Sequence, residues 1–284
     1  MPARLIVNAD DFGLTRGINR AIAELHSAGA LTSATLMANG PAFEDAVAIA
    51  HAHPTLGVGC HIVLTDGIPL SPPDQIPTLL GPDGKSLRPS LIDFTQALLR
   101  GKIKSSEIEL EALLQIHKLQ QAGIRITHLN THKHTHIFPL VCERLLALAD
   151  SNNIPAIRNP FEPAFALSLH HGTLLRRLQI QTLKRFRPRF EAAIKAHHGK
   201  VATTDGTLAI SATGSLNKVT LAEILAAVPT TGTYELCCHP GYNDSDLALI
   251  TTRLRAHRNT EREALLTQIP RTLSHTAPPI LIDY

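Results

Sequence analysis

The stretch RLIVNADDFGLTRGINRAIAELHS, residues 4–27, is the clearest indication of the fold class, because it passes from a short apolar run to a longer helical pattern. Residues 4–8 have the length and character of a strand buried inside a parallel sheet. Residues 17–27 repeat apolar side chains at the spacing of one helix face. No G-x-G-x-x-G motif follows the strand, which disfavours a doubly wound dinucleotide-binding sheet. The start of the chain therefore predicts a βα unit whose strand is followed by two acids, Asp10 and Asp11.

The same alternation of short β-type runs and longer helical patterns continues through the chain. The predicted strands are 4–8, 33–38, 57–64, 125–130, 156–158, 200–203, 234–238 and 279–282. The predicted helices are 17–27, 41–52, 106–122, 139–150, 174–196, 221–228 and 244–273, the last with a break. Eight strands that alternate with helices predict an α/β fold, either a (β/α) barrel or a distorted, TIM-like relative of one, with the active site at the C-terminal ends of the strands. Because we find no internal repeat and no separable second domain, we expect residues 1–284 to form a single domain.

Two stretches depart from this alternation. Residues 66–104 are rich in proline and glycine and predict a long loop excursion over the active face. Residues 174–200 carry eight Lys and Arg against one Glu, a local charge of +7 in a chain of formal net charge +3. This basic helical segment is either a solvated helix face or an interfacial helix or lid whose arginines meet anionic lipid headgroups. In the second case the side chains that would touch lipid are Leu174, Leu175, Leu178, Ile180, Leu183, Phe186 and Phe190.

The composition excludes several classes of protein. With 44% hydrophobic and 18% charged residues among 284, the chain can bury a large core, so wholesale disorder is excluded. A net charge of +3 is too small to favour nucleic acid as a partner. The four cysteines form no C-x-x-C pair, so we expect neither a disulfide framework nor a cysteine-based zinc site. We find no signal-type start and no apolar stretch near the ~18–20 residues of a membrane span, so we expect a cytoplasmic protein.

Carboxylates and imidazoles follow four of the predicted strands. Sixteen histidines is an unusual number for this length, and four of them fall in the tract HLNTHKHTH at 128–136. The other strand ends carry Asp10 and Asp11, His61, and the CHPG sequence that contains His239. In a parallel barrel these ends share one face, where two imidazoles and a carboxylate with room for water make an open catalytic metal site. Because neighbouring strand residues point to opposite sides, Asp10 and Asp11 need not be equivalent, so one can bind metal while the other acts as a base.

Each of these signals also has a simpler interpretation. The sequence DDFG could serve only to cap the following helix, and a lone histidine such as His61 is more often packed or solvated than a ligand. The histidine tract could be a solvated, adventitious metal-binding segment, and His239-Pro240-Gly241 could be no more than a turn. Because the residues of all these motifs are predicted to lie on one face of the barrel, a catalytic site is favoured over the separate simpler interpretations.

Five motifs, in order along the chain, resemble one known family. They are IVNADDFGLTRGINRAI from residue 6, LTSATLMANGPAFEDAV from residue 31, GVGCHIVLTDGIPL from residue 57, THLNTHKHTHIFP from residue 127 and YELCCHPGY from residue 234. Together they are similar to the YdjC-like carbohydrate deacetylases, which include the chitooligosaccharide deacetylases and the deacetylases associated with hopanoid biosynthesis. The phrases NGPAFEDAV and YELCCHPGY resemble the hopanoid-associated branch, which removes acetyl from an N-acetylglucosaminyl lipid.

The resemblance implies a metal set and two catalytic residues. The ligands of one divalent ion are implied at Asp11, His61 and His132. The carboxylate before the metal aspartate, Asp10, is implied to be catalytic, and His239 is implied to be the general acid.

Further positions are assigned less directly. Arg158 matches an arginine of the family and, with His136, is a candidate for substrate binding. The family usually has Asp where this chain has Asn130, and the loss of charge would weaken a role in orienting a histidine. The roles of His128, His134 and His136 stay open between metal support, substrate binding and structure.

These assignments predict a metal-dependent hydrolase that removes the N-acetyl group from an N-acetylglucosamine unit. Asp10 is a poor base at its ordinary pKa, so either burial raises that pKa or Asp10 acts on metal-acidified water. The ligand set favours zinc, with magnesium as the alternative.

A hopanoid-type glycolipid is the favoured substrate and a short chitooligosaccharide the alternative. A metal-dependent phosphoesterase and a non-catalytic metal- or sugar-binding protein are the alternatives from other classes. A homodimer and peripheral contact with the inner membrane surface through residues 174–190 also stay open.

Overall fold

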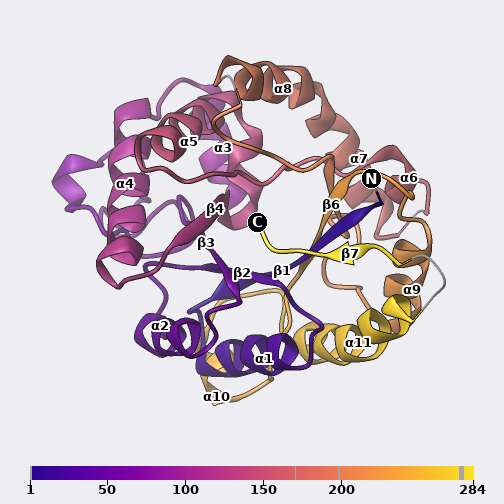
Figure 1. Cartoon of the computed structure of the whole chain (residues 1–284). Helices are drawn as coiled ribbons and strands as arrows, with labels where there is room; N and C mark the ends of the chain where they lie inside the picture. Colours follow the sequence, from indigo (N-terminus) through magenta and orange to yellow (C-terminus); the bar gives the residue numbers. More distant parts are fainter. Residues whose placement is uncertain (1, 170, 198, 275–277) are drawn as a thin grey trace.

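The apolar run that follows Arg4 forms the central strand of a curved parallel sheet (Figure 1). The computed structural model describes residues 2–169, 171–197, 199–274 and 278–284. The strands lie in the order β4-β3-β2-β1-β6-β5, and β7 pairs with the first residues of β1. They are β1 (Arg4–Phe12), β2 (Ser33–Leu36), β3 (Gly57–Ile62), β4 (Ile126–Thr131), β5 (Gly206–Leu208), β6 (Thr233–Cys238) and β7 (Ile280–Leu281). Every residue of β1 after Arg4 is buried, as expected for a strand that is covered on both faces.

Helices surround the outer side of the sheet (Figure 1). The first of them begins after Thr15, whose hydroxyl accepts a hydrogen bond from the N–H of Ile18 at 3.2 Å and satisfies one free donor of the first turn. The longer helices are α1 (Arg16–Ser27), α2 (Phe43–Ala52), α3 (Leu91–Leu99), α4 (Ser105–Gln121), α5 (Pro139–Ser151), α7 (Leu174–Leu183), α8 (Arg187–Ala196), α9 (Lys218–Ala226) and α11 (Ala256–Leu273). The shorter ones are α6 (Ala164–Leu167) and α10 (Ser245–Leu249), with the 3-10 turns η1 (Pro73–Gln75), η2 (His132–Ile137) and η3 (Lys184–Phe186).

The sheet curls into a half-barrel, which confirms the prediction of a distorted, TIM-like barrel in one domain. Strands β4 and β5 are the two ends of the hydrogen-bonded path, and between them the predicted strands 156–158 and 200–203 contribute only isolated bridges. The prediction of eight regular strands is therefore wrong at these two places. Pro155 and Pro160 bracket the first of them, and proline lacks the N–H that a longer ladder needs.

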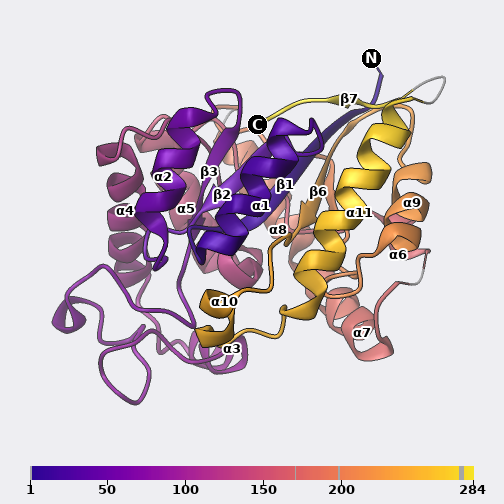
Figure 2. The same cartoon turned by 90° about the horizontal axis from the view of Figure 1, so that it is seen from below.

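The carboxyl ends of the strands lie at one side of the molecule, the lower side in Figure 2. Helices α3, α7 and α10 lie on this side, together with the long segment 66–104. That segment, which the sequence predicts to be a loop excursion, includes η1 and the whole of α3.

The basic segment is helical over residues 174–196, and several of its large apolar side chains face the protein, while the side chain of Leu175 lies outside the described residues. Four of them are buried or pack against the core: Ile180, Leu183, Phe186 and Phe190. Phe186 and Phe190 make edge-to-face contacts with Phe138 and Phe161. The prediction that these four side chains touch lipid is therefore wrong, because they fill the space between the segment and the barrel. Leu174 and Leu178 remain 70% and 56% exposed. Among the described residues, no helix is both long and apolar enough to cross a membrane.

Candidate metal centre and active site

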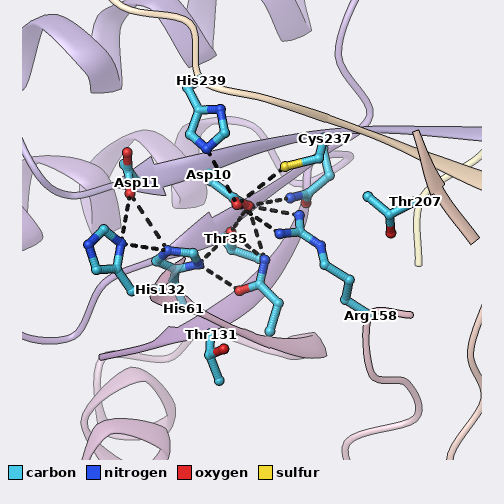
Figure 3. Close-up of polar contacts among 12 residues, drawn as sticks. Asp10, Asp11, Thr35, His61, Thr131, His132, Arg158, Thr207, Cys237 and His239 are labelled. Carbon is cyan, nitrogen blue, oxygen red and sulfur yellow. Dashed lines mark hydrogen bonds and ion pairs between the residues drawn. The ribbon is translucent and has the colours of Figure 1, made fainter. Parts of the chain in front are cut away.

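The strand ends bring the predicted side chains to one place (Figure 3). These are Asp10 and Asp11 of β1, His61 of β3, His132 directly after β4 and His239 directly after β6. The β1–β2 ladder is irregular between Ala9 and Phe12, and Asp11 has a left-handed backbone, with φ 67°. A bulge of this kind redirects side chains, so two consecutive carboxylates reach the same site and do not point to opposite faces of the sheet.

Three ligand-type atoms form a nearly equilateral triangle. Asp11 Oδ1 lies 3.6 Å from His61 Nε2 and 3.5 Å from His132 Nδ1, and the two nitrogens are 3.4 Å apart. Bonds of about 2.1 Å at the tetrahedral angle separate ligand atoms by about 3.4 Å, so the triangle has the size of one face of a tetrahedral site. Asp11 and His61 are buried, whereas the side chain of His132 is 20% exposed. The three residues therefore fit a divalent ion whose remaining coordination positions are free for water or substrate.

Buried partners orient two of these three side chains. Asn130 Nδ2 donates to Asp10 Oδ1 at 3.0 Å, which leaves Asn130 Oδ1 to accept from His61 Nδ1–H at 2.7 Å. His61 therefore presents the lone pair of Nε2 to the triangle. Arg258 Nη2 donates to Asp11 Oδ2 at 2.6 Å, so the other oxygen of this carboxylate faces the imidazoles. The asparagine thus keeps a hydrogen bond to His61 although it lacks the charge of the aspartate that the family resemblance leads us to expect there.

Asp10 is held by donors on both carboxylate oxygens. Arg158 donates from Nη1 to Oδ2 at 2.7 Å and from Nη2 to Oδ1 at 2.8 Å. Burial by itself raises the pKa of Asp10, but the charge of Arg158 and the neighbouring imidazoles outweigh it and hold the pKa well below its usual range. Asp10 is therefore ionised, and a pKa raised by burial is not the source of its basicity. Its remaining donors are Asn8, Thr35, Asn130 and the thiol of Cys237.

A buried polar network lies behind Arg158. Its guanidinium also donates to Glu235 of β6, whose carboxylate accepts the hydroxyl of Tyr284. Tyr284 stacks on the imidazole of His128, with ring centroids 3.8 Å apart. That imidazole lies directly against Gly59 of β3, where a Cβ would collide with the ring. Polar side chains therefore fill the inside of the half-barrel, and Arg158, with no exposed surface, contacts the site from beneath.

The turn after β4 is fixed by its own side chains. His136 has no exposed surface; its Nδ1 lies 2.7 Å from Thr131 Oγ1, which also accepts the backbone N–H of His136 at 3.0 Å. Lys133 and His134 have left-handed backbones, and Lys133 pairs with Asp66 at 2.6 Å. These contacts set the position of His132, the candidate metal ligand at the start of the turn.

His239 lies between two carboxylates. Its Nε2 is 3.8 Å from Asp10 Oδ2, and its Nδ1 is 4.0 Å from Glu261 Oε2. The backbone N–H of His239 also donates to Glu261 Oε2 at 2.6 Å. Burial lowers the pKa of His239 to about 4 and raises the pKa of Glu261 to about 7, because desolvation disfavours both charged forms.

A second group of ligand-type atoms consists of Asp10, Cys237 and His239. The carboxylate of Asp10 is already paired with the guanidinium of Arg158, and burial raises the pKa of the Cys237 thiol well above its usual value. A cation there would compete with Arg158 and meet a protonated thiol. The group with Asp11 is the better candidate for a metal.

The structure places six of the seven predicted site residues around one point, and the seventh, His136, against Thr131. Sequence reasoning missed Arg258, Glu261 and Glu235, which contact the site residues from outside the strand ends. Arg258 and Glu261 are three residues apart on α11 and so share one helix face. Two charges on the buried face of a helix are the signal that could have identified them.

The fold and the site together define a parallel α/β half-barrel with a carboxylate–imidazole cluster at its strand ends. The chain belongs to the YdjC-like protein family, which it matches over residues 4–274. A carbohydrate deacetylase of Thermoanaerobacter pseudethanolicus is 31% identical over 261 residues, or 92% of this chain and 90% of that protein. A carbohydrate deacetylase of Brevibacillus brevis is 42% identical over 158 residues, or 56% of this chain and 60% of that protein. The family resemblance is thereby confirmed, while the choice between the chitooligosaccharide and hopanoid branches stays a prediction.

Two crystal structures share the fold. A protein of Enterococcus faecalis V583, named for a proposed cleavage of cellobiose phosphate, matches with a TM-score of 0.78 and 24% identity, over 100% of this chain and 98% of that one. An uncharacterized protein of Agrobacterium tumefaciens C58 matches with a TM-score of 0.54 and 11% identity, over 99% of this chain and 88% of that one. At these identities the likeness establishes the fold alone.

Proposed function

We propose that this protein is a metal-dependent carbohydrate deacetylase, which hydrolyses the acetamide of an N-acetylglucosamine unit. The observation that carries the proposal is the triangle of Asp11, His61 and His132 beside the ionised Asp10 (Figure 3). The relatives named carbohydrate deacetylases support the same chemistry, and one of them aligns over 92% of this chain.

Asp11, His61 and His132 would hold one divalent ion. Octahedral ligation with bonds of about 2.1 Å would separate neighbouring ligand atoms by about 3.0 Å, as for magnesium. The observed separations of 3.4 to 3.6 Å match tetrahedral ligation better and support zinc. When bound, such an ion would polarise the amide carbonyl and lower the pKa of water.

Asp10 would take the proton of the attacking water. Its Oδ2 is the oxygen nearer to His239, at 3.8 Å from Nε2. Because Arg158 keeps the pKa of Asp10 low, this carboxylate accepts a proton efficiently only from water that is itself acidified. The water oxygen adds to the carbonyl carbon while its proton passes to Asp10.

His239 would deliver the proton that the leaving nitrogen needs. The short path from Asp10 to His239 lets the proton taken from water move to the imidazole. As the C–N bond breaks, this proton passes to the nitrogen, so that a free amine leaves and the two side chains regain their starting states. The other hydrogen of the water stays with the acetic acid, which then ionises to acetate in solution. His239 is 12% exposed and so reachable from the open side of the site.

Acetate release tests the proposal. We expect release from N,N′-diacetylchitobiose or from an N-acetylglucosaminyl lipid, loss of release with EDTA, and recovery with zinc. Asp10→Asn should lower kcat by about 10²–10⁴-fold, the usual contribution of a general base. Activity that survives both EDTA and Asp10→Asn contradicts the mechanism. Turnover of 4-nitrophenyl phosphate without acetate release would favour a phosphoesterase, and sugar binding without turnover would favour a binding protein.

A glycolipid of hopanoid type is the proposed carrier of the sugar. Six large apolar side chains are strongly exposed on elements of the active side of the molecule (Figure 2): Ile68, Ile92, Leu99, Leu174, Leu178 and Leu249. Exposed apolar side chains on several elements of this side support a partner with an apolar part, which a chitooligosaccharide does not offer. Higher kcat/KM for the lipid than for chitobiose is expected, and the reverse order would favour the chitooligosaccharide.

Peripheral membrane contact and a homodimer stay predictions with separate tests. The double variant Leu174→Ser/Leu178→Ser should reduce flotation with anionic vesicles, whereas Val219→Ser, an exposed apolar position on α9, should leave it unchanged. Light scattering of the purified protein gives the oligomeric state.

A further inference from the structure

Helix α11 contributes two buried charged side chains to the site although it lies outside the sheet (Figure 2). Arg258 and Glu261 are each 1% exposed. Arg258 contacts Asp11, the candidate metal-binding carboxylate, and Glu261 contacts His239. Because the two positions are three residues apart, a single face of α11 supports both halves of the site.

Glu261 lies on the side of His239 that faces away from Asp10. Oε2 of Glu261 accepts the backbone N–H of His239 at 2.6 Å and is 4.0 Å from Nδ1 of its ring. The other ring nitrogen, Nε2, is 3.8 Å from Asp10 Oδ2. The imidazole therefore has one carboxylate beside each nitrogen. The charge of Asp10 opposes the lowering of the His239 pKa by burial, and the contacts with Glu261 fix the direction of Nε2.

The second oxygen of Glu261, Oε1, takes no part in the contact with the backbone of His239. Oε1 is buried and has no hydrogen bond of good geometry among the described residues, although the backbone of Gly214 lies close enough to lower the pKa of the carboxyl. A buried carboxylate oxygen without a partner is destabilising, so its retention at this position calls for an explanation. The Nδ1–H of His239 lies 4.0 Å from Oε2 of the same carboxylate and can bond it after a small approach of the two side chains, since catalytic hydrogen bonds are often long in the free enzyme.

We propose that Glu261 is a positioning residue that holds His239 as the proton donor to the leaving group. This inference rests on the proposed deacetylase function. Glu261 does not touch the reacting atoms; it acts by orienting the imidazole and stabilising its charged form. Removal of the negative charge should therefore impair departure of the amine far more than substrate binding or attack by water.

The leaving group separates this role from a structural one. An amine leaves only with a proton, whereas a 4-nitrophenolate leaves as an anion and needs none. Both an N-acetyl sugar and 4-nitrophenyl acetate present the same acetyl group to the same site. A defect in His239 as an acid should therefore appear with the amide and be nearly absent with the aryl ester.

The experiment compares Glu261→Gln with Glu263→Gln in the metal-loaded full chain. Glutamine keeps an acceptor for the backbone N–H of His239 but removes the charge. Glu263 is exposed on the same helix and contacts Asn259, which makes it a matched control. For Glu261→Gln we expect kcat for the N-acetyl sugar to fall by about 10²-fold, KM to stay within about twofold, and ester hydrolysis to stay within about threefold of wild type. Glu263→Gln should match wild type on both substrates.

Equal losses on amide and ester in Glu261→Gln would overturn the inference, because they indicate a merely structural role. Glu261→Asp, which keeps the charge, is the second variant in case the glutamine variant does not fold. Because the shorter side chain withdraws the carboxylate from Nδ1 of His239, its amide-to-ester rate ratio should fall below that of wild type, and a wild-type ratio would equally overturn the inference. A wild-type protein that cleaves the ester but no N-acetyl sugar would instead overturn the proposed function on which the inference rests.

Discussion

Arg158 binds Asp10 with both arms of its guanidinium, at 2.7 Å to one carboxylate oxygen and 2.8 Å to the other. A planar fork of this kind fixes the plane of the carboxylate as well as its charge. Neither residue has more than 3% of its surface exposed, so the pair acts in a low-dielectric environment, where its geometry matters most. The pairing explains why the pKa of Asp10 is lowered in spite of its burial.

Replacement of Arg158 by lysine should therefore damage catalysis. A lysine ammonium cannot satisfy two oxygens in one plane, so Asp10 is expected to lose its fixed orientation. We expect Arg158→Lys to lower kcat for acetate release by about 10²-fold, within the range of a misplaced general base. Arg144→Lys is the control, since Arg144 makes only a surface pair with Glu109 at 3.5 Å. Wild-type kcat in Arg158→Lys would contradict this account of Asp10.

Asn130 should influence metal affinity through His61. Its Oδ1 accepts from His61 Nδ1–H at 2.7 Å and so selects the ring form whose Nε2 faces the triangle. Asn130→Leu removes that acceptor at similar volume, and metal affinity is expected to fall by about 10–100-fold, as for other partners of metal-binding histidines. Asn130→Asp retains an acceptor and should stay within about threefold of wild type. Competition with a chromophoric chelator gives the dissociation constants, and equal affinity in wild type and Asn130→Leu would refute the role.

Much of the site could be predicted because it depends on local sequence. Asp10, Asp11, His61 and His239 each come at or next to the end of a short apolar run, and a parallel sheet gathers such ends on one side. The central strand and its helix were equally clear, since their periodicities are unambiguous. These positions follow from the backbone alone and need no knowledge of packing.

The remaining features depend on contacts between distant parts of the chain. The prediction failed for the strand at 156–158, where flanking prolines limit pairing, and for Phe190, whose burial depends on contact with Phe161. Arg258 lies 247 residues from the carboxylate it binds, so no local pattern links the two. The left-handed backbone of Asp11 likewise depends on the irregular pairing of β1 with β2 and has no glycine to mark it.

Loss of a triangle residue should abolish metal binding without unfolding the chain. His61→Ala removes one of the three ligand atoms, which lie 3.4 to 3.6 Å from one another. Zinc affinity should fall by more than about 100-fold, because loss of a ligand costs more than loss of a residue that only hydrogen-bonds a ligand. Elemental analysis after dialysis should find about one zinc per chain in wild type and almost none in the variant. His257→Ala, at an exposed position of α11, should retain the metal. Full zinc content in His61→Ala would exclude this residue as a ligand.

The buried neutral histidines should make the metal-free protein sensitive to acid, and His136 provides the clearest test. It has no exposed surface, and burial lowers its pKa from 6.5 to about 3. Between pH 6.5 and about pH 3 the unfolded chain binds more protons than the folded one. The folded state is therefore most stable above pH 6.5, and its free energy of unfolding decreases as the pH falls through this range. One such group should lower the free energy of unfolding by about 2 kcal/mol between about pH 7 and pH 5.

His136→Gln removes this proton linkage, so its free energy of unfolding should depend less steeply on pH than that of wild type, by roughly the amount assigned to one group. Urea denaturation with EDTA at both pH values measures the difference and keeps metal binding out of it. His257→Gln is the control and should retain the wild-type slope, because His257 lies at an exposed position of α11. The comparison uses slopes, so a general loss of stability in His136→Gln does not obscure it. Identical slopes in all three proteins would show that His136 takes up its proton without unfolding, and would contradict its burial against Thr131 as a neutral ring.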